Sequence, residues 1–241
     1  MSEERYCGCG AKIEPRPIVW RPGRPYWPAR CPGCEARAQA AIKVRELGLR
    51  RRAKRRILRK RLHNTIPPHF RLAHIRHLPP VVRNKLLKLA PRKGGYLYGL
   101  CGVGKSYSLC AIARLMLTEG YTVRRVVWER LTLDIRGTYK SNKQSERDLL
   151  QPLIDCDVLI IEDVGTTTSA GGTESDFNLR VLLTILDSRL EGRRPTWLSS
   201  NKSVEQLAQT FDDRIGSRLH EHCEIILLEG PDRRKMSKRS D

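Results

Sequence analysis

The sequence predicts an α/β fold: a parallel central sheet flanked by helices, preceded by a basic helix and a small cysteine-rich module. An aromatic run at 96–98 is followed by a glycine-rich turn and a helical pattern. A second apolar run, at 158–161, has no polar alternation, as expected of a strand buried on both faces. From residue 94 onward strand and helix patterns alternate, which favours a parallel sheet with right-handed crossovers.

Composition limits the class of protein. The 241 residues are enough for one ordinary domain and an appendage. With 39% hydrophobic and 30% charged residues, the chain is typical of a soluble protein with a modest core. No apolar run approaches membrane-spanning length, and the first residues show no signal-peptide pattern. We therefore expect a cytoplasmic protein without a membrane partner.

The positive charge lies in the first part of the chain. Residues 1–93 contain 25 Lys/Arg and 5 Asp/Glu, whereas residues 94–241 contain 21 of each. Clustered cations bind polyanions by releasing counterions from phosphates, so a basic arm indicates a nucleic-acid partner. The alternative is a basic tail that binds nucleic acid only nonspecifically or aids solubility.

Residues 1–34 contain two cysteine pairs, Cys7-x-Cys9 and Cys31-x₂-Cys34. The proline-rich segment between the pairs is too short to bury a core, and four thiolates around Zn²⁺ would stabilise it. Disulfides are the alternative, although a cytosolic protein would be kept reduced. We read the other four cysteines as ordinary thiols: Cys101, Cys110, Cys156 and Cys223.

A strongly basic helix is expected next. From residue 35 to 63 the chain carries 12 Lys/Arg and 2 Glu, and Gly48 is a point where the helix can be interrupted. Charge on most faces excludes a core-packing helix, so the segment could lie along nucleic acid or serve as a linker. We assign 1–34 to the zinc module, 35–65 to a basic helical linker and 66–241 to the globular domain, which begins with a short helix at 81–89.

The glycine-rich turn has the pattern G-x-x-x-x-G-K-S between a strand and a helix, which is the context of a phosphate-binding loop. Glycines let several backbone N–H groups point at one anion, and the helix N-terminus adds to the field. Lys105 would contact the β- and γ-phosphates of ATP, and the Ser106 hydroxyl would bind Mg²⁺. The nucleotide-binding residues predicted here are Gly99, Gly102, Val103, Gly104, Lys105, Ser106 and Tyr107. A glycine turn with a solvated lysine is the alternative.

Two carboxylates, Glu162 and Asp163, follow the second apolar run. At the carboxyl end of a parallel strand they would lie beside the phosphate loop, one in the Mg²⁺ shell and one orienting the attacking water. Acidic turn residues are the alternative reading.

The remaining pattern predicts helices at 105–119, 129–153 (in two parts, with a break at 141–143), 176–190 and 211–220. Strands are expected at 122–128, 195–200 and 223–228, a flexible loop at 165–172 and a capping box at Ser203–Gln206. Asn201 directly follows the strand at 195–200, where it could touch the γ-phosphate or the attacking water.

Five ordered segments, GLCGVGKS, VLIIEDVG, RPTWLSSN, DDRIGSRL and GPDRR, resemble the AAA+ ATPases of the DnaC/DnaI helicase-loader and IstB group. The similarity runs from about Ile66 to about Arg234 and is closest to phage DnaC-like replication proteins. A cysteine module followed by a charged helix resembles phage and DnaI-type loaders more than IstB proteins.

The resemblance implies roles for single residues. Asn201 matches the sensor-1 position and Arg234 the sensor-2 arginine, with Arg233 as a close competitor. Arg218 matches the arginine finger that completes the ATP site of a neighbouring subunit, so the resemblance implies an ATP-bridged oligomer. Arg214 is a neighbour that either assists or is a surface residue.

The resemblance also implies single-stranded DNA contacts at Tyr139, Ser175 and Phe177, whose aromatic rings would stack on bases. An aromatic side chain on an amphipathic helix is otherwise a core residue. The chain departs from the family in having Glu162-Asp163 where Asp-Glu or Asp-Asp is usual. In this register Glu162 faces Mg²⁺, and Asp163 is one methylene short of the usual catalytic glutamate. We therefore expect slow, partner-regulated hydrolysis of ATP to ADP and phosphate.

These observations favour an ATP-dependent loader of a DnaB-type replicative helicase onto single-stranded DNA. A transposition regulator resembling IstB, which acts on double-stranded DNA, is the second hypothesis. A nucleic-acid-binding module whose ATP site is only structural is the third.

Overall fold

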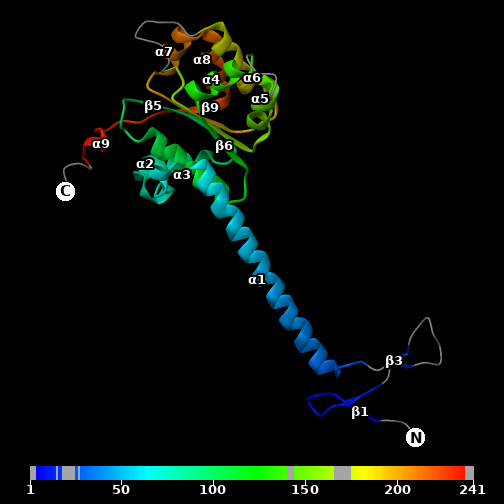
Figure 1. Cartoon of the computed structure of the whole chain (residues 1–241). Helices are drawn as coiled ribbons and strands as arrows, with labels where there is room; N and C mark the ends of the chain where they lie inside the picture. The colour runs from blue at the N-terminus through cyan, green and yellow to red at the C-terminus, as the bar shows by residue number, and fades with distance from the viewer. Residues whose placement is uncertain are drawn as a thin grey trace. The chain divides into compact units, whose positions relative to one another are not determined.

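The computed structural model describes residues 4–14, 16–17, 25–26, 28–139, 144–165 and 175–236 of the chain, which divides into two compact units, Met1–Ile57 and Leu58–Asp241 (Figure 1). The predicted loop at 165–172 lies outside these residues except for its first position. Among the described residues, no helix combines the length and apolar character needed to cross a membrane.

The first unit contains two short antiparallel hairpins and most of a long helix. Strand β1 (Arg5–Tyr6) pairs with β2 (Lys12–Ile13), and β3 (Arg16–Pro17) pairs with β4 (Pro25–Tyr26). Helix α1 (Pro32–Thr65) is continuous through Gly48, so the interruption considered there is absent. No side chain of α1 is fully buried, because its charges surround the helix.

The second unit is built on a five-stranded parallel sheet, which confirms the predicted fold class. Its strands lie in the order β6-β7-β8-β5-β9 and are β5 (Gly94–Tyr98), β6 (Val123–Val127), β7 (Val158–Glu162), β8 (Thr196–Ser200) and β9 (Cys223–Leu227). Every pairing is parallel. Glycine is required in β5, since a Cβ on Gly94 would lie 1.9 Å from the Thr196 carbonyl oxygen of β8.

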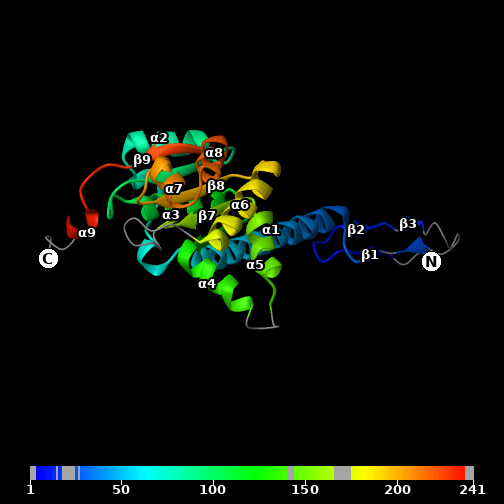
Figure 2. The ribbon, with the colours of Figure 1, turned by 90° about the horizontal axis from the view of Figure 1, so that it is seen from above.

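Helices cover both faces of this sheet (Figures 1 and 2). One face packs against α4 (Trp128–Thr138), α5 (Glu146–Asp155), α6 (Asp176–Glu191), α7 (Val204–Thr210) and α8 (Asp213–His222). The other packs against α2 (Pro80–Leu89), α3 (Lys105–Thr118) and the last turns of α1. Leu159 and Ile161 of β7 belong to the first core, whereas Val158 and Ile160 belong to the second. Strand β7 is therefore apolar without alternation because both of its faces are buried.

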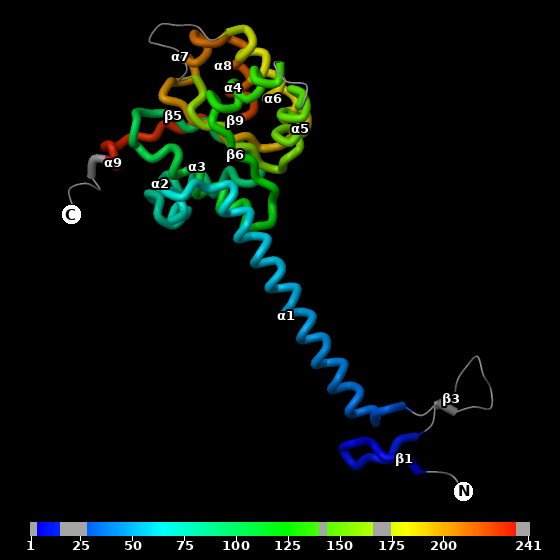
Figure 3. The backbone as a smooth tube through the Cα atoms, viewed as in Figure 1, coloured from blue at the N-terminus to red at the C-terminus, as the bar shows by residue number. Residues whose placement is uncertain are grey.

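Short elements that periodicity did not predict complete the fold. Two 3₁₀ turns, η1 (Pro68–Phe70) and η2 (Ile75–His77), lie between α1 and α2. A final turn, α9 (Arg233–Met236), follows β9, as the backbone tube shows (Figure 3).

The predicted capping box is present at the start of α7, where the Ser203 hydroxyl accepts from the Gln206 N–H.

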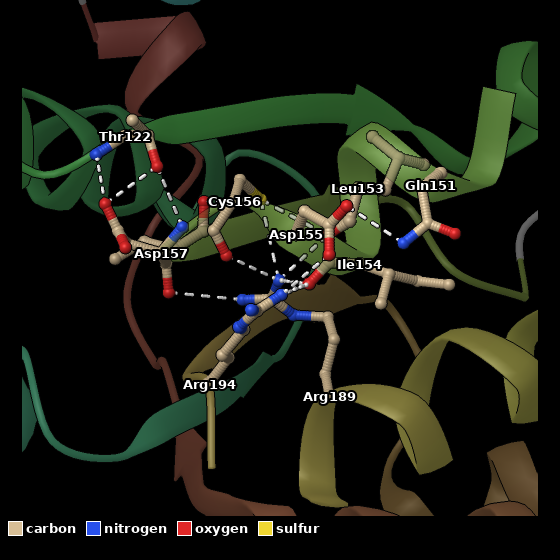
Figure 4. A network of polar contacts seen from close by, with 10 residues as sticks. Thr122, Gln151, Leu153, Ile154, Asp155, Cys156, Asp157, Arg189 and Arg194 are labelled. Carbon is tan, nitrogen blue, oxygen red and sulfur yellow. Dashed lines mark hydrogen bonds and ion pairs between the residues drawn. The ribbon is translucent and has the colours of Figure 1, made fainter. Parts of the chain in front are cut away.

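A buried arginine joins the ends of several elements. Arg189 of α6 has no exposed surface and donates hydrogen bonds to the backbone carbonyls at the end of α5 and the start of β7 and β8 (Figure 4). Its Nε atom donates to the Thr196 hydroxyl at 2.8 Å, and this hydroxyl also lies 2.8 Å from Nε2 of buried His222. Burial lowers the pKa of His222 to about 4.

Candidate functional site

A cavity of about 570 Å³ lies where the phosphate loop, β7 and β8 end. Polar and charged side chains from distant parts of the second unit converge on it, at the edge of a parallel sheet where ligands commonly bind. The lining residues are Phe70, Cys101, Gly102, Gly104, Lys105, Ser106, Tyr107, Asp163, Asn201, Arg233 and Arg234. The structure thus brings together the predicted phosphate loop, Asn201, one residue of the acidic pair and both sensor-2 candidates.

Lys105, the first residue of α3, is held by a fixed set of acceptors. Its Nζ atom donates to the carbonyl oxygens of Gly99 and Leu100 at 2.8 and 2.9 Å and to Asn201 Oδ1 at 2.7 Å. Burial lowers the pKa of its ammonium group, while Cys101 and Asp163 act in the opposite direction. The lysine therefore lies between the phosphate loop and the end of β8, where a bound phosphate would replace weaker acceptors.

The backbone of the phosphate loop fits an anion cradle. Gly102 and Gly104 have positive φ angles, 83° and 106°, which a residue with a side chain rarely adopts. The C-terminal segment covers this loop: the Arg233 N–H donates to the Gly102 carbonyl at 3.1 Å, and a Cβ on Gly102 would meet the Asp232 carboxylate. Arg233 and Arg234 thus reach the cavity from α9, an element that no periodic pattern marked.

The acidic pair is divided between two environments. Asp163 lines the cavity and has a positive φ angle of 59° directly after β7. Glu162 is buried on β7, and its Oε1 atom accepts from Arg125 Nε of β6 at 2.6 Å. Sequence reasoning missed Arg125, whose only signal was a pair of arginines within a short strand of valines. The magnesium and catalytic roles of Glu162 and Asp163 remain predictions.

The predicted arginine finger, Arg218, lies outside the cavity on α8. Its guanidinium contacts Asp187 Oδ1 at 2.6 Å and Glu221 Oε2 at 3.0 Å and keeps 41% of its surface exposed. Arg214, one turn earlier, pairs with Asp212. The role of Arg218 as an arginine finger remains a prediction.

The three predicted DNA-contact residues form one cluster. The rings of Tyr139 and Phe177 meet edge to face with centroids 6.2 Å apart. Arg136 and Arg180 lie over the Phe177 ring, at 5.1 and 5.4 Å from its centroid, and Arg136 also donates to the Ser175 hydroxyl. Tyr139 is 64% exposed, so it does not belong to the hydrophobic core.

The four N-terminal cysteines also come together. Their sulfur atoms all lie within 4.8 Å of one another, and tetrahedral zinc with Zn–S bonds of about 2.3 Å requires sulfurs about 3.8 Å apart. All four are free thiols, and the shortest recorded separation, Cys9 Sγ to Cys31 Sγ, is 3.5 Å, so no disulfide joins them. Backbone N–H groups of Cys31 and Cys9 lower the pKa of Cys7, whereas the neighbouring thiols Cys9, Cys31 and Cys7 raise the pKa of Cys34. The donor set therefore fits zinc.

Two aromatic residues line the cavity beside the phosphate loop. Phe70 of η1 and Tyr107 of α3 meet edge to face at 6.5 Å, and the Tyr107 hydroxyl lies 3.1 Å from Nδ1 of His77. Sequence reasoning included Tyr107 but missed Phe70, since η1 lies between prolines and carries no periodic signal.

The chain is similar to proteins of a known family. The family model for IstB-like ATP binding proteins matches residues 93–241. The replicative helicase loader DnaC of Escherichia coli (strain K12) is 26% identical over 121 residues, covering 50% of this chain and 47% of the relative. The replicative helicase loader DnaI of Bacillus subtilis (strain 168) is 27% identical over 141 residues, covering 58% and 43%. The chain spans about half the length of these curated relatives.

A solved structure of DnaI superposes with a TM-score of 0.54 and 25% identity, covering 70% of this chain and 94% of that one. The region matched by the family model, residues 93–241, contains the phosphate loop, the acidic strand and α8, the elements that frame the cavity and carry the predicted finger. The chain therefore belongs to the family of IstB-like ATP binding proteins and has the AAA+ fold of the DnaC and DnaI helicase loaders.

Proposed function

We propose that the chain is an ATP-dependent loader that places a DnaB-type replicative helicase on single-stranded DNA in the cytoplasm. The observation that carries this proposal is the cavity in which Lys105, Asp163 and Asn201 converge, in a chain whose curated relatives are helicase loaders. Positioning and charge neutralisation are the main work of phosphoryl transfer, and this set of side chains supplies both.

In this proposal each side chain has a defined task. Lys105 neutralises the β- and γ-phosphates, and Ser106 with Glu162 holds Mg²⁺, which supplies charge stabilisation when bound. Asp163 orients the attacking water, Asn201 contacts the γ-phosphate, and an arginine of α9 senses the nucleotide. Glu162 would first have to leave Arg125, which favours a slow turnover that a partner can accelerate.

The proposed assembly is an oligomer in which Arg218 of one subunit completes the ATP site of the next. Its ion pairs to Asp187 and Glu221 are partly exposed, so breaking them would cost little free energy. Arg218 could then contact the triphosphate bound to a neighbouring subunit. The cluster of Tyr139, Ser175 and Phe177 would contact single-stranded DNA, with exposed Tyr139 as the stacking platform.

We propose three functional regions: a zinc module at 1–34, a basic linker at 35–65 and the ATPase domain at 66–241. The zinc module would contribute to holding the helicase. A continuous α1 from Pro32 to Thr65 supports treating the linker as one helix that begins within the module.

The decisive experiment mixes the purified full chain, ATP, single-stranded DNA and the replicative helicase of the same host and measures complex size by light scattering. The proposal expects a stoichiometric complex that requires ATP and is lost in Lys105→Ala. Failure of the wild-type chain to bind the helicase in the presence of ATP would overturn it.

The family match favours a second candidate, an IstB-like regulator of transposition that acts on double-stranded DNA. Pull-down against a transposase in place of the helicase separates the two. If Asp163→Asn left biological activity unchanged, the ATP site would be structural and the chain would be a nucleic-acid-binding module.

A further inference from the structure

The segment from residue 47 to 118 contains 18 Lys/Arg and no Asp or Glu. It includes the second half of α1, both 3₁₀ turns, α2 and α3. A long stretch with one sign of charge creates a field that neighbouring acidic side chains of the same segment do not cancel.

Two hollows lie beside the last two turns of α1. The first, of about 320 Å³, is lined by Arg61, Arg124 and Arg125 together with Asn64, Thr65, Leu117, Thr122 and Val123. The second, of about 280 Å³, is lined by Arg59, Leu62, His63, Ile66, Arg71 and Arg114. Residues 59 and 61 lie about 200° apart around the helix, so the two hollows flank α1 on opposite sides.

No carboxylate lines either hollow. Arg61 and Arg124 are exposed, and within the described part of the chain neither forms an ion pair. Arg125 contributes positive charge at the inner wall of the first hollow, where its side chain is 14% exposed and contacts Glu162 and the Cys110 thiol. The hydroxyl of Thr65 and the amide of Asn64 add neutral hydrogen-bonding groups, whereas the Thr122 hydroxyl is already bonded to Asp157. Such a set suits phosphate oxygens.

The two hollows also lack the aromatic side chains that sites for single-stranded nucleic acid use. No Phe, Tyr or Trp lines either of them, whereas single-stranded nucleic acid is held by bases stacked on aromatic side chains. Cations on both sides of a rigid helix match the regularly spaced phosphates of a duplex instead. In addition, β6 is an edge strand of the five-stranded sheet and contributes residues to the first hollow. The outer edge of an edge strand carries backbone N–H and C=O groups that can bond to a ligand.

We propose that the last turns of α1, with the two basic hollows that flank them, form a binding surface for the phosphate backbone of duplex DNA. This surface is separate from the ATP cavity and from the cluster at Tyr139 and Phe177. It binds without nucleotide, and so it stands whether or not the chain is a helicase loader.

The test measures binding of the full chain to a fluorescently labelled duplex of mixed sequence, and to one of its single strands, by anisotropy at several salt concentrations and without ATP. The variant Arg61→Gln/Arg124→Gln removes two charges from the first hollow and leaves the Arg125–Glu162 ion pair in place. The control Lys88→Gln/Arg92→Gln removes two exposed charges on and just after α2. Helix α2 packs against β5, three strands away from β6.

Each phosphate contact contributes about 0.9 to the slope of log K against log salt. We expect the loss of two contacts in the hollow variant to lower this slope for the duplex by about 1.8. Taking equal binding at 1 M salt as the reference, this corresponds to roughly 60-fold weaker binding at about 0.1 M salt, while the control variant changes the slope little. Single-strand binding should fall much less. Equal losses on duplex and single strand, or equal duplex affinities in the two variants with unchanged circular dichroism, would overturn the proposal.

Discussion

Replacing Arg189 by Met tests whether this buried cation organises the end of the sheet opposite the ATP cavity. Its guanidinium donates to five backbone carbonyls at 2.7 to 3.3 Å (Figure 4). It also donates to the Thr196 hydroxyl at 2.8 Å. Some of these carbonyls lie in the last turn of α5, where they have no partner within the helix. A cation at this position also opposes the negative end of the helix dipole.

The size of the effect follows from burial. Each buried carbonyl left without a donor costs about 1–3 kcal/mol, and removing one side of a buried charged network typically costs about 3–5 kcal/mol. We expect Arg189→Met to lower the free energy of unfolding by roughly 3–5 kcal/mol, because methionine fills the space without donating. For a protein of this size that corresponds to a melting temperature lower by roughly 6–20 °C.

The assay is urea unfolding of the full chain followed by tryptophan fluorescence, which reports on buried Trp128 and Trp197. Arg194 provides the matched control. It contacts the Ile154 carbonyl and Asp155 in the same region, but its side chain is 39% exposed, so Arg194→Met should cost only about 0–1 kcal/mol. Equal losses in the two variants would refute the reasoning.

Three further predictions concern the oligomer, pH and zinc. Arg218→Ala should retain ATP binding but lose steady-state hydrolysis by roughly 10³-fold, whereas Arg214→Ala should keep it; equal rates would exclude a finger role. Since burial depresses the pKa of His222 to about 4, the unfolded chain binds its proton more readily, and stability should fall as pH drops from about 6.5 to 4. A urea series across this range should show a smaller fall for His222→Gln. Metal analysis should find one zinc per chain and none in Cys34→Ser; zinc-free, folded wild-type protein would contradict this.

The buried strand and the phosphate loop were predictable because each depends on the residues of one short segment. The apolar run of β7 and the glycines of the phosphate loop each have a single favourable arrangement, and the structure confirms the parallel sheet that they indicate. Asn201 and Lys105 could both be expected near the γ-phosphate because the carboxyl ends of parallel strands meet at one edge, and in the structure Lys105 Nζ donates to Asn201 Oδ1 at 2.7 Å.

Other parts depend on tertiary contacts that no periodicity records. Phe70 reaches the cavity from a single 3₁₀ turn, and α9 is one short turn against the phosphate loop. The pairing of Glu162 with Arg125 joins two strands whose order in the sheet the sequence alone leaves open. For the same reason the two hollows beside α1 became visible only once α1, α3 and β6 were seen together.

Binding of labelled ATP with magnesium tests the central claim most directly, namely that a triphosphate is held between Lys105, the end of β7 and Asn201. Equilibrium dialysis should show saturable binding of about one ATP per chain, at least 100-fold weaker in Lys105→Ala, since the lost ammonium makes charge-assisted bonds worth roughly 3 kcal/mol. The control Lys88→Gln should bind as the wild type does. No saturable binding by the wild-type chain, or equal affinity in Lys105→Ala, would contradict the account.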